Sequence, residues 1–279
     1  MNEHFREVAD GERFEFGKNW SHFLSVLNDR RIEEAIKSLQ HMLNLDSFQG
    51  KTFLDVGSGS GLFSLSARKL GATVHSFDYD PQSVACTAEL KRRYSPTDSF
   101  WKIYHGSILD ESFVNSLGKF DIVYSWGVLH HTGSMWEALQ NVTQLIEGGG
   151  LLFIAIYNDQ GLASRFWTAV KYFHSRLPKG LKFLVIWPLF LTFWTLIFLR
   201  DIFRGKLFYT WKTYNNRRGM SPWHDFVDWV GGYPFEVAKP EAIFDFFRNR
   251  DFQLIRLKTC GGRLGCNEFV FKKSTEKKI

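Results

Sequence analysis

The sequence predicts an α/β protein whose mostly parallel sheet carries helices on both faces. Three observations predict this class. Short apolar runs alternate with helical stretches from residue 50 onwards, a glycine-rich turn follows the first run, and the alternation resumes near the C-terminus. The 279 residues suffice for one enlarged domain with its own core, and 44% hydrophobic residues exclude a disordered chain.

Residues 1–50 are predicted to form an N-terminal helical lid. Apolar residues recur there at the spacing of one helix face: Ile32, Ala35, Ile36, Leu39, Met42 and Leu43. The aromatic run 14–20 is expected to fold over a bound ligand, although plain packing explains it equally well. No apolar stretch follows the charged segment 1–13, and three cysteines form no secretory framework, so a reducing cytoplasm is the expected compartment.

The alternating region supplies the elements of the sheet in order. Strands are predicted over 52–56, 73–77, 101–105, 120–125 and 151–157, and helices over 62–70, 81–93, 111–117 and from 134 to near 148. Asp80 is the expected N-cap of the helix that begins at Pro81. Ser134 and Glu137 have the spacing of a capping box for the helix that follows them.

The pattern breaks at Asn158 and resumes at Pro240, with a helix to about Arg250 and strands over 252–259 and 267–271. We therefore expect a sheet domain built from residues 51–158 and 240–279, interrupted by an inserted cap at residues 159–239.

A glycine-rich loop between the first strand and the next helix indicates a cofactor site. Residues 55–61 read Asp-Val-Gly-Ser-Gly-Ser-Gly, and glycines let the backbone N–H groups approach a ligand. The dinucleotide-binding pattern requires glycine at position 62, which is Leu62 here. Asp55 ahead of the glycines favours a cofactor with an ammonium group over one with a pyrophosphate.

In these residues the sequence resembles the class I S-adenosylmethionine-dependent methyltransferases, most nearly the small-molecule enzymes of the ubiquinone-biosynthesis type. Four segments carry the resemblance: 54–61, 77–81, 105–108 and 120–131. It covers about residues 50–157 and, more weakly, 240–272. It implies a Rossmann-like seven-stranded sheet with an antiparallel last strand, S-adenosylmethionine as cofactor and S-adenosylhomocysteine as product.

The resemblance also implies which residues bind the cofactor. Asp78 is expected to hold the ribose hydroxyls, the segment after the third strand the adenine, and the segment after the fourth strand the methionine end. The full set is Asp55, Gly57, Ser58, Gly59, Gly61, Asp78, Tyr79, Ser107, Ile108, Ser125, Trp126 and Gly127. Ser107 departs from the family pattern, because many relatives place there an acid for the adenine amino group.

Candidate catalytic residues are His130, His131, His224 and Asp225. Methyl transfer needs alignment above all, and a base only where the acceptor must lose a proton. The two adjacent histidines fit a role in pocket shape as well, and the His224–Asp225 pair fits a surface loop. Tyr157 and Asn158 are expected near the acceptor. No metal is expected, because Cys260 and Cys266 lack zinc-site spacing.

The basic excess of the chain lies in one segment. Residues 161–219 hold eleven basic residues and one acid, a net +10, which leaves −4 for the rest of a chain at +6. Residues 183–199 are uncharged but short and interrupted by Pro188, so we expect them to lie in a membrane interface rather than to span. A packed helical cap and an RNA-binding surface are the alternatives.

The predicted function is methyl transfer to a small, amphiphilic or quinone-like acceptor. Contact with the inner face of a membrane is expected through residues 161–219, and nucleic acid is not the expected partner. An RNA-modifying methyltransferase and a non-catalytic, cofactor-binding partner of another protein remain the alternatives.

Overall fold

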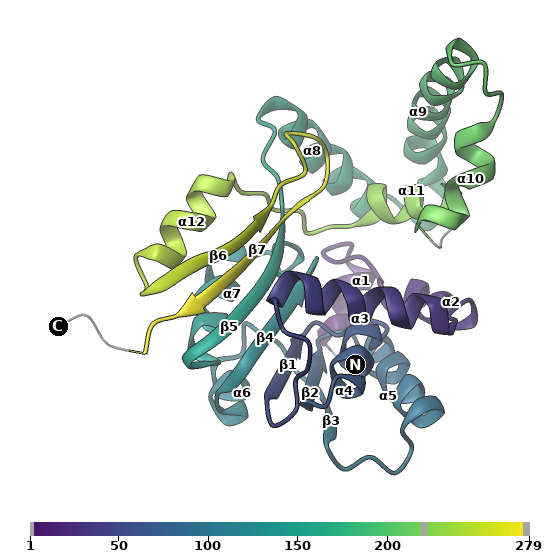
Figure 1. The fold of residues 1–279 in the computed structure, drawn as a ribbon. Coiled ribbons are helices and arrows are strands. Elements are labelled where there is room, and N and C mark those ends of the chain that lie inside the picture. Colours follow the sequence, from purple (N-terminus) through teal and green to yellow (C-terminus); the bar gives the residue numbers. More distant parts are fainter. Residues whose placement is uncertain (1–2, 219–221, 276–279) are drawn as a thin grey trace. The chain divides into compact units, whose positions relative to one another are not determined.

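The computed structural model divides the chain into two compact units. The first, the sheet unit, comprises Phe16–Ser164 and Phe235–Ile279, and the second, the helical unit, comprises Met1–Glu15 and Arg165–Pro234. The structure describes residues 3–218 and 222–275 (Figure 1). Within these ranges it leaves aside the side chains of His22, Lys179, 214–218, Pro222, His224, Asp225 and Asp228. The predicted lid, 1–50, is thus divided between the units.

The sheet unit is built on a seven-stranded sheet in the order β3-β2-β1-β4-β5-β7-β6. Strand β7 runs antiparallel to both of its neighbours, and the other pairs are parallel. This confirms the predicted fold class. The strands are β1 Thr52–Val56, β2 Thr73–Asp78, β3 Trp101–His105, β4 Phe120–Trp126, β5 Ile146–Tyr157, β6 Phe252–Lys258 and β7 Cys266–Lys273.

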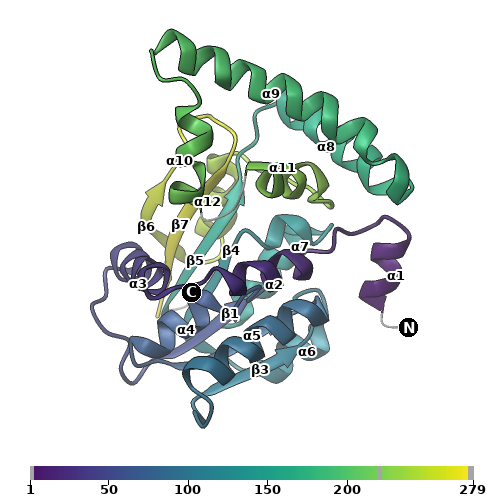
Figure 2. The ribbon, with the colours of Figure 1, turned by 90° about the vertical axis from the view of Figure 1, so that its right-hand side faces the viewer.

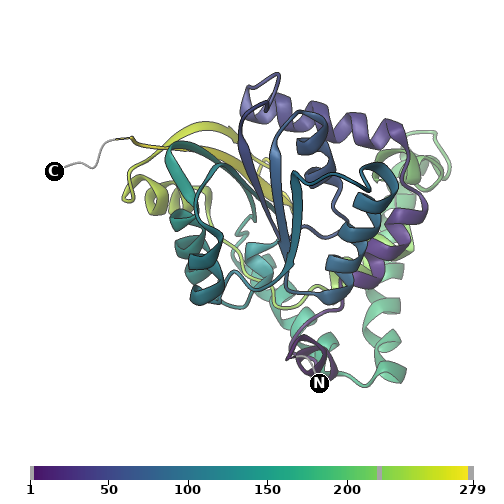
Figure 3. The same cartoon turned by 90° about the horizontal axis from the view of Figure 1, so that it is seen from below.

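Helices cover both faces of this sheet, as Figure 3 shows from below. One core cluster joins the sheet to α2 Gly17–Ser25, α3 Asp29–Leu43, α4 Leu62–Lys69 and α5 Pro81–Tyr94. The other core cluster joins it to α6 Glu111–Leu117, the 3-10 turn η1 Leu129–His131, α7 Met135–Gln144 and α12 Pro240–Arg248. The apolar spacing of residues 32–43 thus predicted a helix face that is buried on the sheet.

Carboxylates cap the helices that follow the second and third strands. The Asp80 carboxylate accepts a hydrogen bond from the Gln82 N–H at 2.8 Å, which confirms the predicted N-cap of α5. It also accepts one from the Gly17 N–H at 2.7 Å, so the same side chain holds the start of α2. Asp110 caps α6 through the N–H groups of Ser112 and Phe113.

The predicted capping box at α7 is wrong. Ser134 makes no side-chain cap hydrogen bond, and the Met135 N–H donates instead to the Glu236 carboxylate at 2.9 Å. A carboxylate from a segment distant in sequence therefore takes the place of the local cap. Spacing within a helix cannot indicate such a partner.

The end of α7 and the start of β5 also differ from the expectation. The helix ends at Gln144, and β5 begins at Ile146 and includes the three glycines before Leu151. The pairing of β4 with β5 shifts between Phe120 and Ile122, where the extra residues form an irregularity. Glycines that look like a helix stop therefore belong to a bulged strand.

The helical unit contains the N-terminal helix and most of the insertion. Its elements are α1 Glu3–Ala9, most of α8 Leu162–Arg176, η2 Lys179–Leu181, α9 Phe183–Phe203, α10 Tyr209–Arg218 and α11 Pro222–Gly231. Figure 2 shows α9 and α10 as a helical hairpin. The Phe14 N–H donates to the Tyr233 carbonyl at 2.8 Å, which ties residues near the N-terminus to the end of the insertion.

Pro188 does not interrupt the apolar helix, contrary to the expectation. Helix α9 continues through Pro188 for 21 residues. Proline removes one backbone hydrogen bond but has a helical φ, and aromatic packing along α9 stabilises the turns after it. Among the described residues, α9 is one helix whose length and composition would allow it to cross a membrane.

Replacing Asp80 tests whether its carboxylate holds α2 as well as α5. Asp80→Ala should lower the free energy of unfolding by about 1–2 kcal/mol and speed amide exchange in α2. Asp110→Ala removes a comparable cap from α6 and should cost a similar free energy while leaving exchange in α2 unchanged. Denaturant unfolding and hydrogen-exchange mass spectrometry measure the two effects, and unchanged exchange in Asp80→Ala would contradict the double role.

Candidate functional site

The glycine loop joins β1 to α4 and turns with left-handed backbone angles. Gly57 and Gly59 have φ values of 77° and 54°. A Cβ at Gly57 would lie 2.4 Å from the Val128 side chain, and one at Gly59 would lie 2.9 Å from the Trp20 ring. Side chains are therefore excluded at both positions, by backbone conformation and by lack of space. Gly61 also has a left-handed φ, and the Ser58 hydroxyl bonds to that of Thr87 at 2.9 Å.

Asp78 lies at the carboxyl end of β2 beside this loop. One of its carboxylate oxygens accepts from the Gly59 N–H and the other from the Asp80 N–H, each at 2.9 Å. A carboxylate offers about four acceptor positions, so these N–H groups, together with that of Tyr79, still leave acceptor capacity for a hydroxyl of a ribose. Burial raises the pKa of Asp78 to about 6, against the opposing effect of these N–H groups.

Asp55, at the end of β1, is buried beneath the glycine loop. Its carboxylate accepts from the Ser64 hydroxyl at 2.5 Å. Ser64 in turn is bonded to Ser76, which accepts from the Trp101 indole N–H at 2.8 Å. Burial raises the pKa of Asp55 to about 7, the Ser64 bond lowers it, and the Asp78 charge raises it. Asp55, which is predicted to lie near an ammonium group, is thus held in place by the hydroxyl of Ser64, which is in turn bonded to that of Ser76.

Three further residues predicted to bind the cofactor follow the ends of β2 and β3, of which Ser107 and Ile108 are predicted to contact adenine. The Ser107 hydroxyl accepts from the Leu109 N–H at 3.1 Å. Ile108 is buried in the core, and its carbonyl accepts from the Asn141 amide at 2.9 Å. The Tyr79 carbonyl accepts from a ring nitrogen of His105 at 3.0 Å. Because the Ile108 side chain packs into the core, only the backbone of this residue could contact a ligand. The cofactor-binding roles of Ser107, Ile108 and Tyr79 stay predictions.

The three predicted residues at the end of β4 differ sharply in exposure. Ser125 is fully buried, and its hydroxyl donates to the Val56 carbonyl at 3.0 Å. Trp126 is 45% exposed at the last position of the strand. Gly127 turns the chain with a φ of 75°. Trp126 therefore presents a large ring at the carboxyl edge of the sheet, where open α/β sheets bind ligands.

A short segment at the start of α2 lies over the glycine loop. Gly17 is bonded to Asp80, Trp20 packs against Gly59, and the Phe16 ring lies 5.0 Å from the His131 ring. These contacts join the start of α2 to the end of β2, to the glycine loop and to η1, and the lid role of residues 14–20 stays a prediction. Sequence reasoning named this run but none of its individual contacts, because nothing local links position 17 to position 80.

An aromatic cluster forms where β4 and β5 end. His130 and Tyr157 have ring centroids 4.0 Å apart, and His131 lies 4.6 Å from His130. Phe235 adds a ring 5.1 Å from Tyr157. The Tyr157 N–H donates a long, 3.4 Å hydrogen bond to Nδ1 of His130. The structure thus brings the two predicted histidines together with Tyr157, and it adds Phe235, which the sequence did not indicate.

Glu236 supports this cluster from the segment that returns from the insertion. Its N–H donates to the His130 carbonyl at 2.9 Å, while its carboxylate accepts from the Met135 N–H. Burial raises the Glu236 pKa, opposed by backbone N–H groups of Met135 and Gly133. Glu236 therefore holds the turn around η1 from both sides, a role that no motif predicted.

The other predicted catalytic pair lies outside the described side chains. His224 and Asp225 belong to α11, and their side chains are among those that the structure leaves aside. Their catalytic role stays a prediction. Cys86, Cys260 and Cys266 are free thiols, and no group of His, Cys, Asp and Glu within the described ranges has the arrangement of a metal site.

A family model described as a methyltransferase domain matches residues 27–186, more than half of the chain. The chain belongs to this family. Its fold and family are those of the class I S-adenosylmethionine-dependent methyltransferases, and S-adenosylmethionine is the cofactor, as the motifs predicted.

Curated relatives of this methyltransferase include ubiquinone biosynthesis O-methyltransferases. The protein of Glaesserella parasuis is 31% identical over 137 residues, which are 47% of this chain and 56% of the relative. That of Xanthomonas euvesicatoria is 29% identical over 160 residues, 56% of this chain and 62% of the relative. That of Caulobacter vibrioides is 27% identical over 111 residues, which are 40% of this chain and 42% of the relative. The matched part thus spans about half the length of these relatives.

Solved structures share the fold at low identity. Magnesium protoporphyrin IX methyltransferase from Synechocystis, with bound S-adenosylhomocysteine, has a TM-score of 0.51 at 14% identity, over 88% of this chain and 83% of its own. A [4+2]-cyclase has a TM-score of 0.53 at 10% identity, over 88% of this chain and 81% of its own. Because the second protein is titled a cyclase, the shared fold does not by itself establish methyl transfer.

The residues of the loop fit this cofactor. The Asp78 carboxylate at the end of β2, beside the loop, retains acceptor capacity for a ribose hydroxyl. Asp55 and Asp78 place negative charge near a cofactor that carries positive charge on its sulfonium and ammonium groups. S-adenosylmethionine supplies a methyl group on that sulfonium when bound.

Gly57→Ala should abolish measurable binding of S-adenosylhomocysteine, because the new methyl group meets Val128 and the left-handed φ strains alanine. Gly118→Ala is the matched control. Gly118 has a φ of 79° but open space around it, so its variant should lose about 1 kcal/mol of stability and keep full binding. Isothermal titration calorimetry measures both, and intact binding in Gly57→Ala would rule out this loop as the cofactor site.

The pH dependence of binding should follow Asp78. Ribose hydroxyls donate to the ionised carboxylate, so affinity for S-adenosylhomocysteine should rise as the pH passes through about 6 and then level off. In Asp78→Asn the part of this rise near pH 6 should disappear and binding should weaken, whereas exposed Asp245→Asn should behave as wild type. Calorimetry in two buffers of different ionisation enthalpy would also detect proton release on binding.

The same shifts predict the stability of the ligand-free protein. The pKa values of Asp55 and Asp78 lie above their ordinary value of 3.8, so protonation favours the folded state. Their contribution is fully present below pH 3.8 and is lost as the pH rises through about 6 to 7. The free energy of unfolding attributable to these groups should therefore fall across that window, as a comparison with Asp55→Asn and Asp78→Asn would show.

Proposed function

We propose that the protein transfers the methyl group of S-adenosylmethionine to an oxygen atom of a small amphiphilic, quinone-like acceptor, with S-adenosylhomocysteine as the second product. The observation that carries this proposal is the ring cluster of His130, His131, Tyr157 and Phe235 at the carboxyl ends of β4 and β5. Matches to O-methyltransferases of ubiquinone biosynthesis support the choice of oxygen and of a ring-shaped acceptor.

The acceptor end of the site favours a flat, largely apolar group. His130 and Phe235 are buried, and His131 is 9% exposed, so few waters reach this cluster. Phe16 at the start of α2 closes one side of it. Exclusion of water and alignment of the acceptor are the main contributions an enzyme makes to methyl transfer.

The two adjacent histidines differ in what they can do. Nδ1 of His130 accepts from the Tyr157 N–H, and the His130 carbonyl accepts from Glu236, so this residue is a positioning residue. The His131 ring faces Phe16 and Tyr157 from the same turn. We assign to His131 the removal of the acceptor's hydroxyl proton, which a neutral imidazole nitrogen can accept.

His131→Ala should lower kcat by about 10²-fold or more and leave binding of S-adenosylhomocysteine unchanged. The control is Tyr172→Ala in the helical unit, an exposed aromatic residue that should leave both unchanged. If His131→Ala retains turnover within about threefold of wild type, the base lies elsewhere, and His224→Ala would then be the variant to compare.

The proposed activity is tested with cell extract separated into lipid, small-molecule and RNA fractions. The purified protein and S-adenosylmethionine labelled in the methyl group should label the lipid fraction, and the label should resist base hydrolysis, because base cleaves a methyl ester but not a methyl aryl ether. Label in RNA, lost steeply as salt is raised, would support an RNA-modifying methyltransferase instead. Cofactor binding with no labelled product in any fraction would support a non-catalytic partner protein.

The proposal includes the place of reaction. An amphiphilic acceptor is presented at a membrane surface, and we propose that the methyltransferase meets it at the inner face from the cytoplasm. Bacterial origin of the curated relatives is consistent with that setting.

A further inference from the structure

Helix α9 has two faces that differ in what covers them. Phe190 on one face is buried, and its ring lies 5.4 Å from that of Phe226 and 6.4 Å from that of Trp211. The opposite face leaves large apolar side chains between 43% and 89% exposed. We call them the apolar row: Leu184, Leu191, Leu196, Leu199, Ile202 and Phe203. An exposed apolar surface of this length marks an interaction site.

The apolar row contains nothing that requires water. No charged residue lies between Lys182 and Arg200 in the sequence. On the same face, the Thr192 hydroxyl donates to the Pro188 carbonyl at 2.8 Å, so its polar atom is satisfied within the helix. Thr195 is the other exposed hydroxyl of this stretch, so the row carries no charge and few polar groups, as a helix that lies in the membrane interface requires.

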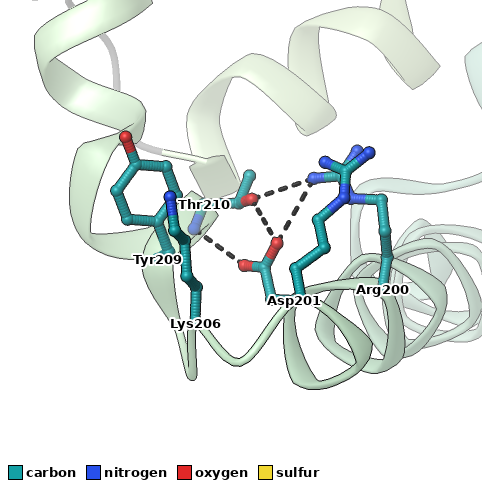
Figure 4. Close-up of a pocket in the computed structure, with 6 residues that line it drawn as sticks. Arg200, Asp201, Lys206, Tyr209 and Thr210 are labelled. Atoms are coloured by element: carbon teal, nitrogen blue, oxygen red, sulfur yellow. Dashed lines mark hydrogen bonds and ion pairs between the residues drawn. The ribbon is translucent and has the colours of Figure 1, made fainter.

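Two cationic side chains lie between exposed apolar ones in the turn that joins α9 to α10. Leu207 and Phe208 extend the exposed apolar surface, while Arg204 and Lys206 stand among them. Beside this turn is a pocket of about 400 Å³ (Figure 4). Three of its six lining residues are basic and one is acidic: Arg200, Asp201, Arg204, Lys206, Tyr209 and Thr210.

The one acid of this pocket is already satisfied. The Asp201 carboxylate accepts from the Thr210 N–H and from the Thr210 hydroxyl, each at 2.8 Å, and pairs with Arg200 at 3.5 Å. These bonds, of which the one from the Thr210 N–H has the largest effect, hold the Asp201 pKa below its usual range. Asp201 thus fixes the start of α10, and the pocket keeps a net positive charge for an anion from outside.

We propose that the hairpin of α9 and α10 docks in the plane of an anionic membrane, with the apolar row among the acyl chains and the cationic pocket against lipid phosphate groups. The juxtaposition of exposed apolar side chains with Arg204 and Lys206 in one turn matches the boundary between acyl chains and headgroups. Trp187 and Trp211, both half-exposed, are of the type that lies at this boundary. The proposal stands independently of the methyl acceptor.

The charge of the segment favours lipid over a second copy of the chain. Residues 161–219 carry a net +10, so two copies meeting through this surface would repel each other, whereas an anionic bilayer attracts it. RNA would require cations interleaved with aromatic rings along the binding face. The apolar row has no such interleaving, and the cations gather at its end.

The packing of α10 favours an in-plane helix over a crossing one. At about 1.5 Å per residue, 21 residues match the hydrocarbon thickness of a bilayer. However, Trp211 of α10 packs on Trp194 of α9 with ring centroids 4.7 Å apart. A crossing α9 would therefore carry α10, whose sequence includes Lys212, Arg217 and Arg218, into the hydrocarbon.

Vesicle sedimentation tests the proposal with the full chain. Wild type should pellet with phosphatidylcholine vesicles that contain about 30% phosphatidylglycerol, pellet far less with pure phosphatidylcholine, and lose much of its binding in about 0.5 M NaCl. Alkaline carbonate should release it. Retention after carbonate would overturn the in-plane arrangement in favour of a crossing helix.

Two variants separate the apolar and the cationic contributions. Leu191→Ser/Leu196→Ser/Leu199→Ser should weaken binding to the anionic vesicles about tenfold or more, and Ile255→Ser/Leu257→Ser/Leu264→Ser, three exposed apolar residues of the sheet unit, should leave it unchanged. Arg204→Gln/Lys206→Gln should abolish the preference for anionic lipid, while Lys37→Gln/Lys119→Gln, with the same change in charge, should retain most of it.

Two further measurements keep the outcome decisive. Unchanged melting temperature and unchanged binding of S-adenosylhomocysteine would show that the variants are folded. Equal pelleting of wild type and the triple serine variant would overturn the proposal, as would a wild type that ignores vesicles but sediments as an oligomer or shifts an RNA probe.

Discussion

Two neighbouring carboxylates at the end of β2 hold together the parts on which the cofactor site depends. Asp78 accepts from the N–H groups of Gly59 and Asp80, and Asp80 accepts from those of Gln82 and Gly17. The glycine loop, the start of α5 and the start of α2 are thereby joined through backbone N–H groups. Ionised acceptors make stronger hydrogen bonds than neutral ones, so two side chains suffice to position three segments.

This arrangement has an electrostatic consequence for ligand binding. Burial of Asp55 and Asp78 raises both pKa values well above their ordinary range, so the ligand-free site carries its negative charge at a free-energy cost. A positively charged cofactor relieves that cost. Asp55 and Asp78, the predicted cofactor ligands, therefore also make the free energy of unfolding of the ligand-free protein depend on pH.

A third carboxylate acts in the same way beside the two predicted histidines. Glu236 enters from the segment that returns from the insertion, caps α7 through Met135 and donates its own N–H to the His130 carbonyl. The chain that leaves β5 at Tyr157 comes back to the same place, because the Ala238 N–H donates to the Tyr157 carbonyl at 3.0 Å. The helical unit can therefore be inserted without loosening the turn that carries His130 and His131.

The sequence by itself determined the order of strands and helices, the glycine loop, the cap at Asp80 and the positive charge of the insertion. Each of these rests on residues that are close together along the chain, where periodicity, glycine and proline act locally. It placed the two predicted histidines next to each other after the fourth strand, but it could not identify Glu236 and Phe235 beside them, or Gly17 and Trp20 against Asp80 and the glycine loop. It also proposed a cap for α7 at Ser134 and an interruption at Pro188 that the structure does not have. The tertiary structure decided these points. The Glu236 carboxylate, distant in sequence, accepts the hydrogen bond of the Met135 N–H in place of the local serine. Aromatic packing on α9 outweighs the one backbone hydrogen bond that a proline removes.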